Sequence, residues 1–289
     1  MPTVSGKFAD LPGRGSRLHY RDWGGAGETL LLLHGLSSNS RIWDLTAPLL
    51  TDRFRVVAVD QRSHGLSDRT DDGYGFEGLS ADIEVFLQVL GIGNPVLVGH
   101  SWGASVALHF AVSHPDSVRA LVMVDGGFID LSQFMPWDEA QRVMLPPDID
   151  GTPVETFIEF MRKWPQFQRI WSEELAGMML SNFDVKEGKI YRRLTIPDHM
   201  KIAQALYDLN AGELLARLTC PALALSCHRD PANPAEREWQ SYRNEALARV
   251  KETAPLVRVQ VMEDTIHDVP IQRPQELAAA LLGFLGSGI

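Results

Sequence analysis

The sequence predicts an α/β protein, with a doubly wound, mostly parallel sheet and an inserted helical cap. Short apolar runs recur along the 289 residues, and helical patterns separate them. Strands and helices that alternate in this way form mostly parallel sheets. The alternation stops in the middle of the chain, where the pattern becomes helical and aromatic. With 45% apolar and 22% charged residues, the chain can bury a core, so we expect a folded protein.

Short runs rich in Leu, Val and Ala are predicted to be buried strands. Between the second and third of these runs, apolar residues recur at helical spacing over Leu79–Leu90, which predicts an amphipathic helix. A last helix is expected to begin near Pro274. The predicted strands are Thr29–Leu33, Phe54–Val59, Pro95–Val98, Val118–Val124, Ala222–Cys227 and Leu256–Met262.

The middle of the chain is predicted to be a cap inserted into the core. We assign residues 1–125 and 213–289 to the core and 126–212 to the helical cap. The cap segment is rich in Phe, Trp and Met. Most of these side chains are expected to pack the cap's own helices. An apolar layer over the sheet would also supply the walls of a ligand pocket.

The charge balance excludes several classes of partner. Lys and Arg number 27 against 37 Asp and Glu, a net charge of −10, which is opposite to the basic surface of nucleic-acid-binding proteins. No apolar run approaches the roughly 18 residues that a membrane span needs, and residues 1–10 lack the pattern of a signal peptide. We therefore expect a cytoplasmic protein that does not bind nucleic acid and has no membrane span.

The two cysteines are expected to be free thiols. Cys220 and Cys227 flank one predicted strand, which would hold their Cα atoms roughly 20 Å apart, beyond disulfide reach. His228 follows Cys227, but no further Cys or His stands at metal-ligand spacing. No metal or cofactor site is predicted.

A candidate nucleophile lies in Gly99-His100-Ser101-Trp102-Gly103, between a predicted strand and a predicted helix. Gly-x-Ser-x-Gly in this context is typical of a tight strand-to-helix turn that lifts the serine hydroxyl clear of the backbone. The helix N-terminus beneath it favours developing negative charge. Alone, the pattern also arises by chance in glycine-rich turns. Ser101 is the predicted nucleophile.

Acyl transfer also needs N–H donors for the oxygen that becomes negative. His34-Gly35 ends the strand Thr29–Leu33, where the glycine allows a close approach. The backbone N–H groups of Leu36 and Trp102 are predicted to form the oxyanion hole. The alternative is an ordinary strand-to-loop turn at His34.

A serine hydroxyl needs a base, and the base needs a third group to orient it. Of the 9 histidines, His267 follows the last predicted strand and precedes the last helix, and we predict it to be the base. For the acid, Asp230 follows the strand Ala222–Cys227 and keeps the order Ser, Asp, His along the chain. Asp125, at the end of Val118–Val124, is the alternative because it would lie at the same edge of the sheet. Asp230 is preferred.

These motifs resemble those of the capped α/β-hydrolases, typified by bacterial carboxylesterases, lactonases and related Ser-His-Asp enzymes. The likeness runs from His19 to the C-terminal helix. It includes Asp60-Gln61-Arg62-Ser63-His64-Gly65-Leu66-Ser67, which is similar to the family's Asp-x-Arg-Gly-x-Gly-x-Ser turn. In the family that turn has a structural role. The resemblance implies an α/β-hydrolase fold with a cap.

Two departures limit what the resemblance implies. Ser63 stands where the family usually has glycine, and Cys227-His228-Arg229 replaces a glycine-bearing turn that often leads to the acid, which weakens the case for Asp230. Members that open epoxides or remove halides have aspartate at the elbow, so Ser101 disfavours those two chemistries.

The sequence thus predicts a serine hydrolase that cleaves an ester or lactone of a small, fairly apolar substrate through an acyl-enzyme. Other chemistry on the same triad is an alternative, namely a carbon–carbon bond hydrolase, a thioesterase, a perhydrolase or an amidase. A receptor that keeps the pocket without turnover is an alternative of another class. Fold alone does not decide among these. The acyl and alcohol groups and the oligomeric state are not predicted.

Overall fold

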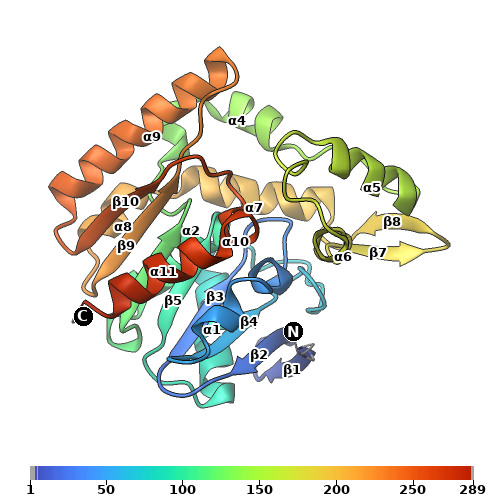
Figure 1. Ribbon diagram of the computed structural model, residues 1–289. Coiled ribbons are helices and arrows are strands. Elements are labelled where there is room, and N and C mark those ends of the chain that lie inside the picture. The colour runs from blue at the N-terminus through green and yellow to red at the C-terminus, as the bar shows by residue number, and fades with distance from the viewer. Residues whose placement is uncertain (1–3, 5, 288–289) are drawn as a thin grey trace.

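An eight-stranded sheet forms the centre of the molecule in the computed structural model, which describes residues 4 and 6–287 (Figure 1). Its strands lie in the order β1-β2-β4-β3-β5-β6-β9-β10. The pairs β1–β2 and β2–β4 are antiparallel, and every other pair is parallel. The strands of the sheet are β1 (Gly6–Leu11), β2 (Ser16–Gly24), β3 (Thr29–Leu33), β4 (Arg55–Val59), β5 (Val96–His100), β6 (Ala120–Val124), β9 (Ala222–Cys227) and β10 (Val257–Met262).

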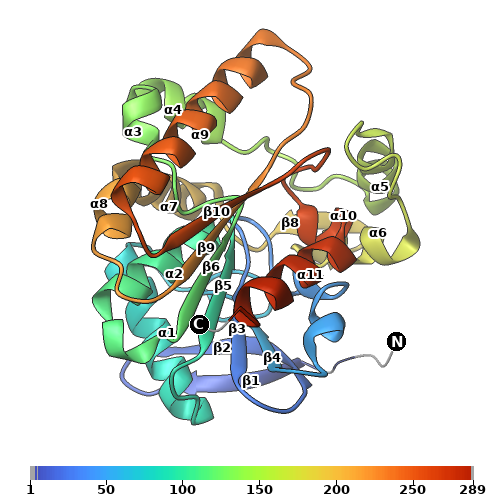
Figure 2. The ribbon, with the colours of Figure 1, turned by 60° about the vertical axis from the view of Figure 1, so that its left-hand side comes forward.

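Helices cover both faces of the sheet, as the doubly wound prediction requires (Figure 2). One face packs on α1, α2, α8 and α9, and the other on α10, α11 and two short 3-10 turns. The helices are α1 (Phe76–Leu90), α2 (Trp102–Ser113), α3 (Leu131–Phe134), α4 (Trp137–Met144), α5 (Val154–Lys163), α6 (Glu173–Leu180), α7 (Ile196–Asp208), α8 (Ala211–Ala216), α9 (Pro234–Thr253), α10 (Val269–Gln272) and α11 (Pro274–Leu285), and the 3-10 turns are η1 (Ser40–Trp43), η2 (Ala47–Leu50) and η3 (Pro115–Ser117).

The central strands are buried on both faces, which explains why they are continuous apolar runs. Leu30 to Leu33 of β3 and Leu97 and Val98 of β5 have no exposed surface. All the predicted strands are present, with boundaries within two residues of the prediction. The predicted helix at Leu79–Leu90 begins three residues earlier, at Phe76.

Two strands of the sheet, β1 and β2, are absent from the sequence prediction. They pair with each other in antiparallel register at one edge of the sheet. β1 has the burial pattern of an edge strand, with only Ala9 and Leu11 buried. Polar residues interrupt the apolar ones in both strands, so no continuous apolar run marks them.

The elements between β6 and β9 contribute no strand to the sheet, and apart from α8, which packs on one face of the sheet, they lie beyond its carboxyl end (Figure 1). They comprise α3 to α8 and a two-stranded antiparallel hairpin, β7 (Phe183–Lys186) and β8 (Lys189–Arg192). The hairpin departs from the expected all-helical pattern. Phe157, Phe167 and Met179 form a small apolar cluster here with Ile266 of the core. Residues 126–212 as a separate cap remain a prediction.

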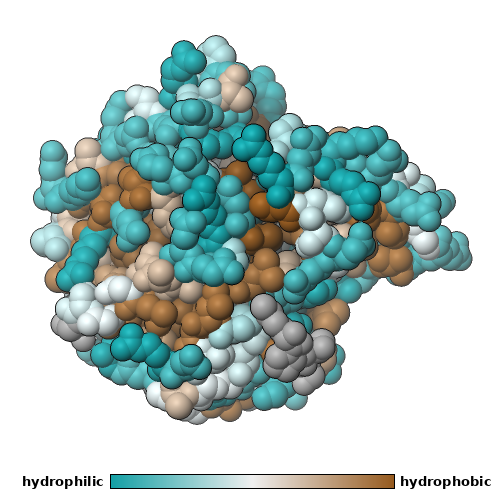
Figure 3. Space-filling model, in the orientation of Figure 1, coloured by the Kyte–Doolittle hydropathy of each residue, from teal (hydrophilic) through white to brown (hydrophobic). Residues whose placement is uncertain are grey.

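Apolar side chains also reach the surface. On the face shown in Figure 3, patches of apolar surface interrupt the hydrophilic surface near its middle, where α10 lies in Figure 1. Ile271 of α10 lines a cavity together with Met161 and Met178, which belong to the segment between β6 and β9. The two cysteines are buried and free, and burial raises the pKa of Cys220 to about 11. No helix among the described residues is long and apolar enough to cross a membrane.

Candidate active site

Ser101 occupies a sharp turn between β5 and α2. Its backbone has φ 54° and ψ −123°, a left-handed conformation that a side chain other than glycine's rarely adopts. Its N–H donates to the carbonyl of Val124 on the neighbouring strand, with an N···O distance of 2.9 Å. The turn therefore holds Ser101 beside the end of β6, and strain of this kind is common at functional sites.

The glycines around Ser101 are required by close backbone contacts. A Cβ at Gly99 would lie 2.2 Å from the carbonyl oxygen of Gly103, and one at Gly103 would lie 2.5 Å from that of His34. Gly126, which the sequence analysis did not single out, is equally confined, because a Cβ there would lie 2.3 Å from the carbonyl oxygen of Ser101. The elbow is thus packed between the ends of β3 and β6.

His267 pairs with the carboxylate of Asp125. The distance from His267 Nδ1 to Asp125 Oδ2 is 2.6 Å. A carboxylate only accepts hydrogen bonds, so the Nδ1 proton lies in this bond and Nε2 of neutral His267 is free to accept a proton. The side chain of His267 is 50% exposed, whereas that of Asp125 is 1% exposed. The pair therefore has a buried acid and an accessible base.

This geometry corrects the preferred acid. Asp230 lies in the exposed loop after β9 and makes no hydrogen bond or ion pair with His267 in the described part of the chain. Asp125, the alternative acid, makes both a hydrogen bond and an ion pair with His267. The ends of β6 and β9 are adjacent, with Val124 paired with Leu225, so a carboxylate after either strand lies at the same edge of the sheet.

Three donors surround Asp125. Its Oδ1 accepts a hydrogen bond from the backbone N–H of Cys227 at 2.8 Å and forms an ion pair with the Arg243 guanidinium. Arg243 Nη2 also lies 2.7 Å from Ser226 Oγ. Burial opposes ionisation, but the hydrogen bond with His267, followed by the charges of His267 and Arg243, holds the pKa of Asp125 below its ordinary value. Asp125 is therefore charged at neutral pH.

The same interactions act on His267. Desolvation of the ring lowers the pKa of His267, but the hydrogen bond and charge of Asp125 raise it more, so the net shift is upward. Asp268 also raises this pKa, and Arg243 lowers it. His100 faces His267 with ring centroids 4.8 Å apart, and its Nε2 lies 2.9 Å from the His267 carbonyl oxygen. Burial lowers the pKa of His100 to about 4, so His100 is neutral and donates to that carbonyl.

Ser101 and His267 are not yet in contact. No hydrogen bond joins Ser101 Oγ to His267 among residues 4 and 6–287. Catalytic hydrogen bonds of this kind are often long in the free enzyme and tighten when substrate binds. The bond of Ser101 N–H to Val124 and the Asp125–His267 pair place both groups at the ends of β5 and β6.

The predicted oxyanion-hole donors are unpaired. Trp102 is the first residue of α2, so its N–H has no acceptor within the helix. The N–H of Leu36 has no acceptor among the described residues. Both flank the elbow, because a Cβ on Gly35 would lie 3.1 Å from Ser101 Cβ. These N–H groups are therefore available to a ligand oxygen.

Two histidines fix the turn after Leu36. The N–H of Ser37 donates to His64 Nε2 at 3.2 Å, and Ser37 Oγ lies 2.9 Å from His199 Nδ1 on α7. Ser37 itself has φ 59°, the left-handed region again. His199 thus links the segment between β6 and β9 to the oxyanion-hole turn, a contact that no sequence pattern indicated.

The Asp60–Ser67 turn is hydrogen-bonded to neighbouring strands close to the site. Asp60 Oδ2 lies 2.7 Å from His19 Nδ1 and accepts the N–H of Leu66 at 2.8 Å. The backbone N–H of Gln61 donates to His34 Nε2 at 2.9 Å, which joins this turn to the oxyanion-hole strand. Ser63, where the family usually has glycine, has φ 61°, the conformation that glycine adopts without cost.

Two cavities border the site. One of about 230 Å³ extends from Leu36 over Met161, Phe167 and Met178, and is mainly apolar. The other, of about 200 Å³, is lined by His267, Asp125 and Arg243 together with residues of α9. Among the residues that the structure describes, no group of three or more His, Cys, Asp or Glu side chains is arranged to hold a metal ion.

Sequence reasoning missed Arg243 and underrated Asp125. Arg243 lies in the middle of a long polar helix, where nothing in the local pattern distinguishes it. The sequence does mark Asp125, because Gly126-Gly127 follow it directly and permit the close packing described above. This glycine pair could have favoured Asp125 over Asp230.

Known proteins resemble this chain over most of its length. A model of the alpha/beta hydrolase family matches residues 30–280. A fluoroacetate dehalogenase from a Burkholderia species is 36% identical over 233 residues, which is 70% of this chain and 72% of that protein.

Another relative shares a shorter segment. A 2-(acetamidomethylene)succinate hydrolase from Mesorhizobium japonicum is 42% identical over 101 residues, 35% of this chain and 36% of the relative, so the match spans about a third of either protein. Among solved structures, an E-2-(acetamidomethylene)succinate hydrolase superposes with a TM-score of 0.79 over 99% of this chain and 100% of that one, at 24% identity. That likeness shows the shared fold.

Proposed function

Because the chain belongs to the alpha/beta hydrolase family, we propose that it is a serine hydrolase that cleaves a carboxylic ester or lactone through an acyl-enzyme. The observation that supports this proposal is the Asp125–His267 pair, with Nε2 of the base free, beside the strained Ser101 turn. Serine at the elbow argues against epoxide opening and dehalogenation, for which the family's pattern has aspartate.

In the proposed mechanism, His267 Nε2 accepts the Ser101 proton while Oγ forms a bond to the substrate carbonyl carbon. The carbonyl electron pair moves to the oxygen, which the N–H groups of Leu36 and Trp102 bind. When the intermediate collapses, the bond to the leaving alcohol breaks and His267 returns the proton to that alcohol. An acyl-enzyme on Ser101 remains.

Water then completes the reaction. His267 takes a proton from water as the water oxygen attacks the acyl carbon, and gives it to Ser101 Oγ as the acid product leaves. Asp125 stabilises the imidazolium in both halves of the reaction. Arg243 and the Cys227 N–H keep Asp125 ionised and fixed while it does so.

Hydrolysis of an amide of a small acid is a second candidate on the same residues. It is favoured by the 42% identity with the 2-(acetamidomethylene)succinate hydrolase over 101 residues, since an acetamido group is part of the substrate named for that protein. A panel of esters, lactones and N-acyl compounds with matched acyl groups separates the two candidates by kcat/KM.

The first experiment measures hydrolysis of p-nitrophenyl acetate and butyrate by the wild type and Ser101→Ala, with mass detection of a serine-directed fluorophosphonate. We expect turnover and a single adduct on Ser101 in the wild type. Both should be lost in Ser101→Ala, with a rate reduction of several orders of magnitude. Near-normal turnover by Ser101→Ala would refute the proposed nucleophile. No adduct and no turnover in the wild type would support a receptor instead.

A further inference from the structure

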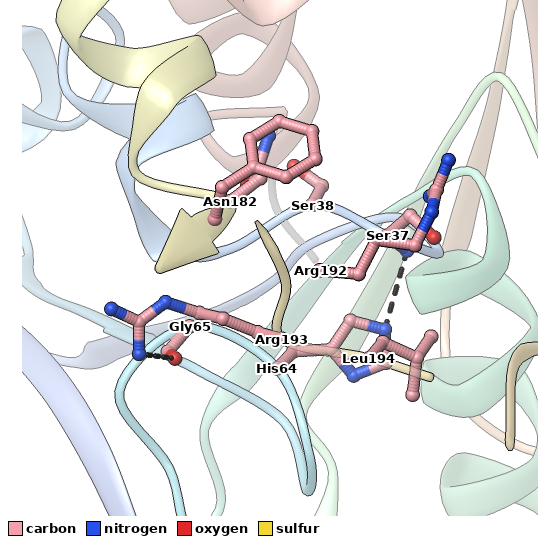
Figure 4. Close-up of a pocket in the computed structure, with 9 residues that line it drawn as sticks. Ser37, Ser38, His64, Gly65, Asn182, Arg192, Arg193 and Leu194 are labelled. Carbon is pink, nitrogen blue, oxygen red and sulfur yellow. Dashed lines mark hydrogen bonds between the residues drawn. The ribbon is translucent and has the colours of Figure 1, made fainter. Parts of the chain in front are cut away.

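A small cavity lies beside Ser37 and Ser38, the residues that follow Leu36 (Figure 4). Its volume is about 40 Å³, room for one small polar group rather than a whole substrate. The core contributes Ser37, Ser38 and His64, and the cap segment contributes Asn182, Arg192 and Arg193. The cavity therefore forms where the two parts of the chain meet.

Arg192 is the charged group of this cavity that has no carboxylate partner. Its Nη2 donates to the carbonyl of Pro147, and its Nε is buried with no hydrogen-bond partner in the described part of the chain. No carboxylate of the described residues forms an ion pair with it, although Asp150 and Asp148 act on it at longer range. A buried N–H of a charged group without an acceptor is costly, so the charge of Arg192 is poorly compensated within the described part of the chain.

Arg192 differs in this respect from its neighbours in the cavity. Arg193 Nε is likewise buried without a hydrogen-bond partner among the described residues, but the charge of Arg193 is paired, with Nη2 3.0 Å from Asp184 Oδ1 and Nη1 donating to the Gly65 carbonyl at 2.8 Å. His64 is neutral, because burial lowers its pKa to about 3, and its Nε2 accepts from Ser37. The unpaired positive charge is notable in a chain whose net charge is −10.

The cavity adjoins the one expected to hold the substrate. Ser37, Ser38 and Asn182 line both this cavity and the apolar cavity that begins at Leu36. A substrate whose carbonyl oxygen contacts the Leu36 N–H would therefore pass the Ser37–Ser38 turn to reach Arg192. Guanidinium and carboxylate form strong charge-assisted hydrogen bonds, and a carboxylate has three heavy atoms, which suits the volume.

We propose that the substrate bears a carboxylate away from the scissile bond and that Arg192 binds it. This inference rests on the proposed function, since it names the substrate class of the same site: half-esters or similar derivatives of small dicarboxylic acids. The apolar cavity accepts the remaining uncharged part. Arg192 acts on binding, whereas Ser101, His267 and Asp125 perform the chemistry.

The test compares two matched ethyl esters, monoethyl glutarate and ethyl butyrate, by titration of released acid at constant pH. The wild type should favour the half-ester by at least tenfold in kcat/KM, chiefly through KM. Arg192→Gln should abolish this preference, because kcat/KM for the half-ester falls much further than kcat/KM for ethyl butyrate, and Arg192→Lys should restore part of it. Arg142→Gln, which removes an exposed charge from α4, is the matched control and should retain the preference.

Two outcomes would overturn the proposal: a wild type that hydrolyses ethyl butyrate better, or an Arg192→Gln variant with the wild-type preference. Calorimetric titration of glutarate into Ser101→Ala and into the Ser101→Ala, Arg192→Gln double variant tests the subsite without turnover. Heat of binding in the first and none in the second supports the subsite even if neither ester is hydrolysed. Equal binding, or none in either, refutes it.

Discussion

Replacing Asp125 with Asn would disable His267 through its tautomer. Asp125 Oδ1 accepts from the Cys227 N–H and from Arg243, and Oδ2 faces His267 Nδ1. An asparagine has one oxygen, and two donors compete for it at the Oδ1 position. Its NH2 group would therefore face His267 and donate to Nδ1. The imidazole proton would then move to Nε2, and the base would have no lone pair toward Ser101.

The expected loss follows from this geometry. Asp-to-Asn replacement that forces the wrong tautomer in a Ser-His-Asp triad lowers kcat by about 10⁴, which corresponds to roughly 5.5 kcal/mol in the activation free energy. Asp125→Asn should approach that value because the carboxylate is 1% exposed and water cannot replace it. Asp230→Asn should change kcat less than about twofold, because Asp230 is exposed and does not contact His267.

The assay is ester hydrolysis under saturating substrate for the wild type and both variants, with circular dichroism to verify folding. The fluorophosphonate adduct rate on Ser101 gives a second readout that does not depend on the choice of ester. If Asp230→Asn lost as much activity as Asp125→Asn, or if Asp125→Asn stayed within tenfold of the wild type, the assignment of the acid would be wrong.

Two further changes probe the surroundings of the triad. Arg243→Gln removes a guanidinium charge that lowers the pKa of His267, so the pKa of His267 should rise. Because His267 acts as a base only when neutral, the acidic limb of the pH profile of kcat/KM should move to higher pH. Arg243→Lys should move this limb back toward its wild-type position. A limb that stays in place or moves to lower pH in Arg243→Gln would contradict the role of Arg243. Gly126→Ala places a Cβ 2.3 Å from the Ser101 carbonyl oxygen, so it should lower the unfolding free energy by about 1–3 kcal/mol and reduce activity. Gly93→Ala, where a Cβ meets nothing within 4 Å, is the control by thermal denaturation, and equal melting temperatures would disprove the packing argument.

The sequence was sufficient for features that depend on local pattern. Buried strands are marked by continuous apolar runs, and Ser101 by glycines that the tight elbow requires. The strands β1 and β2, at one side of the sheet, left no such mark because they are only partly buried. The hairpin β7–β8 is similarly polar, with no buried residue in β7.

The acid could not be chosen from order along the chain. Both Asp125 and Asp230 follow a strand of the same sheet, and the carboxyl ends of β6 and β9 are neighbours. What decides between them is the direction of one side chain and the donors around it, above all Arg243, which lies 118 positions from Asp125 along the chain. Such a contact depends on how α9 packs, and α9 has no pattern that reveals it.

The proposed acid, Asp125, directly follows β6 and lies outside the loop that follows β9. Nucleophile and acid follow directly hydrogen-bonded strands, β5 and β6, so the sheet itself fixes their separation. In the proposed mechanism the loop after β9 therefore supplies no reacting group, although Arg229 and Pro231 of that loop line the cavity beside His267. Under the proposed assignment, exchanges in this loop reshape the space next to His267 while Ser101 and Asp125 keep their places at the ends of β5 and β6.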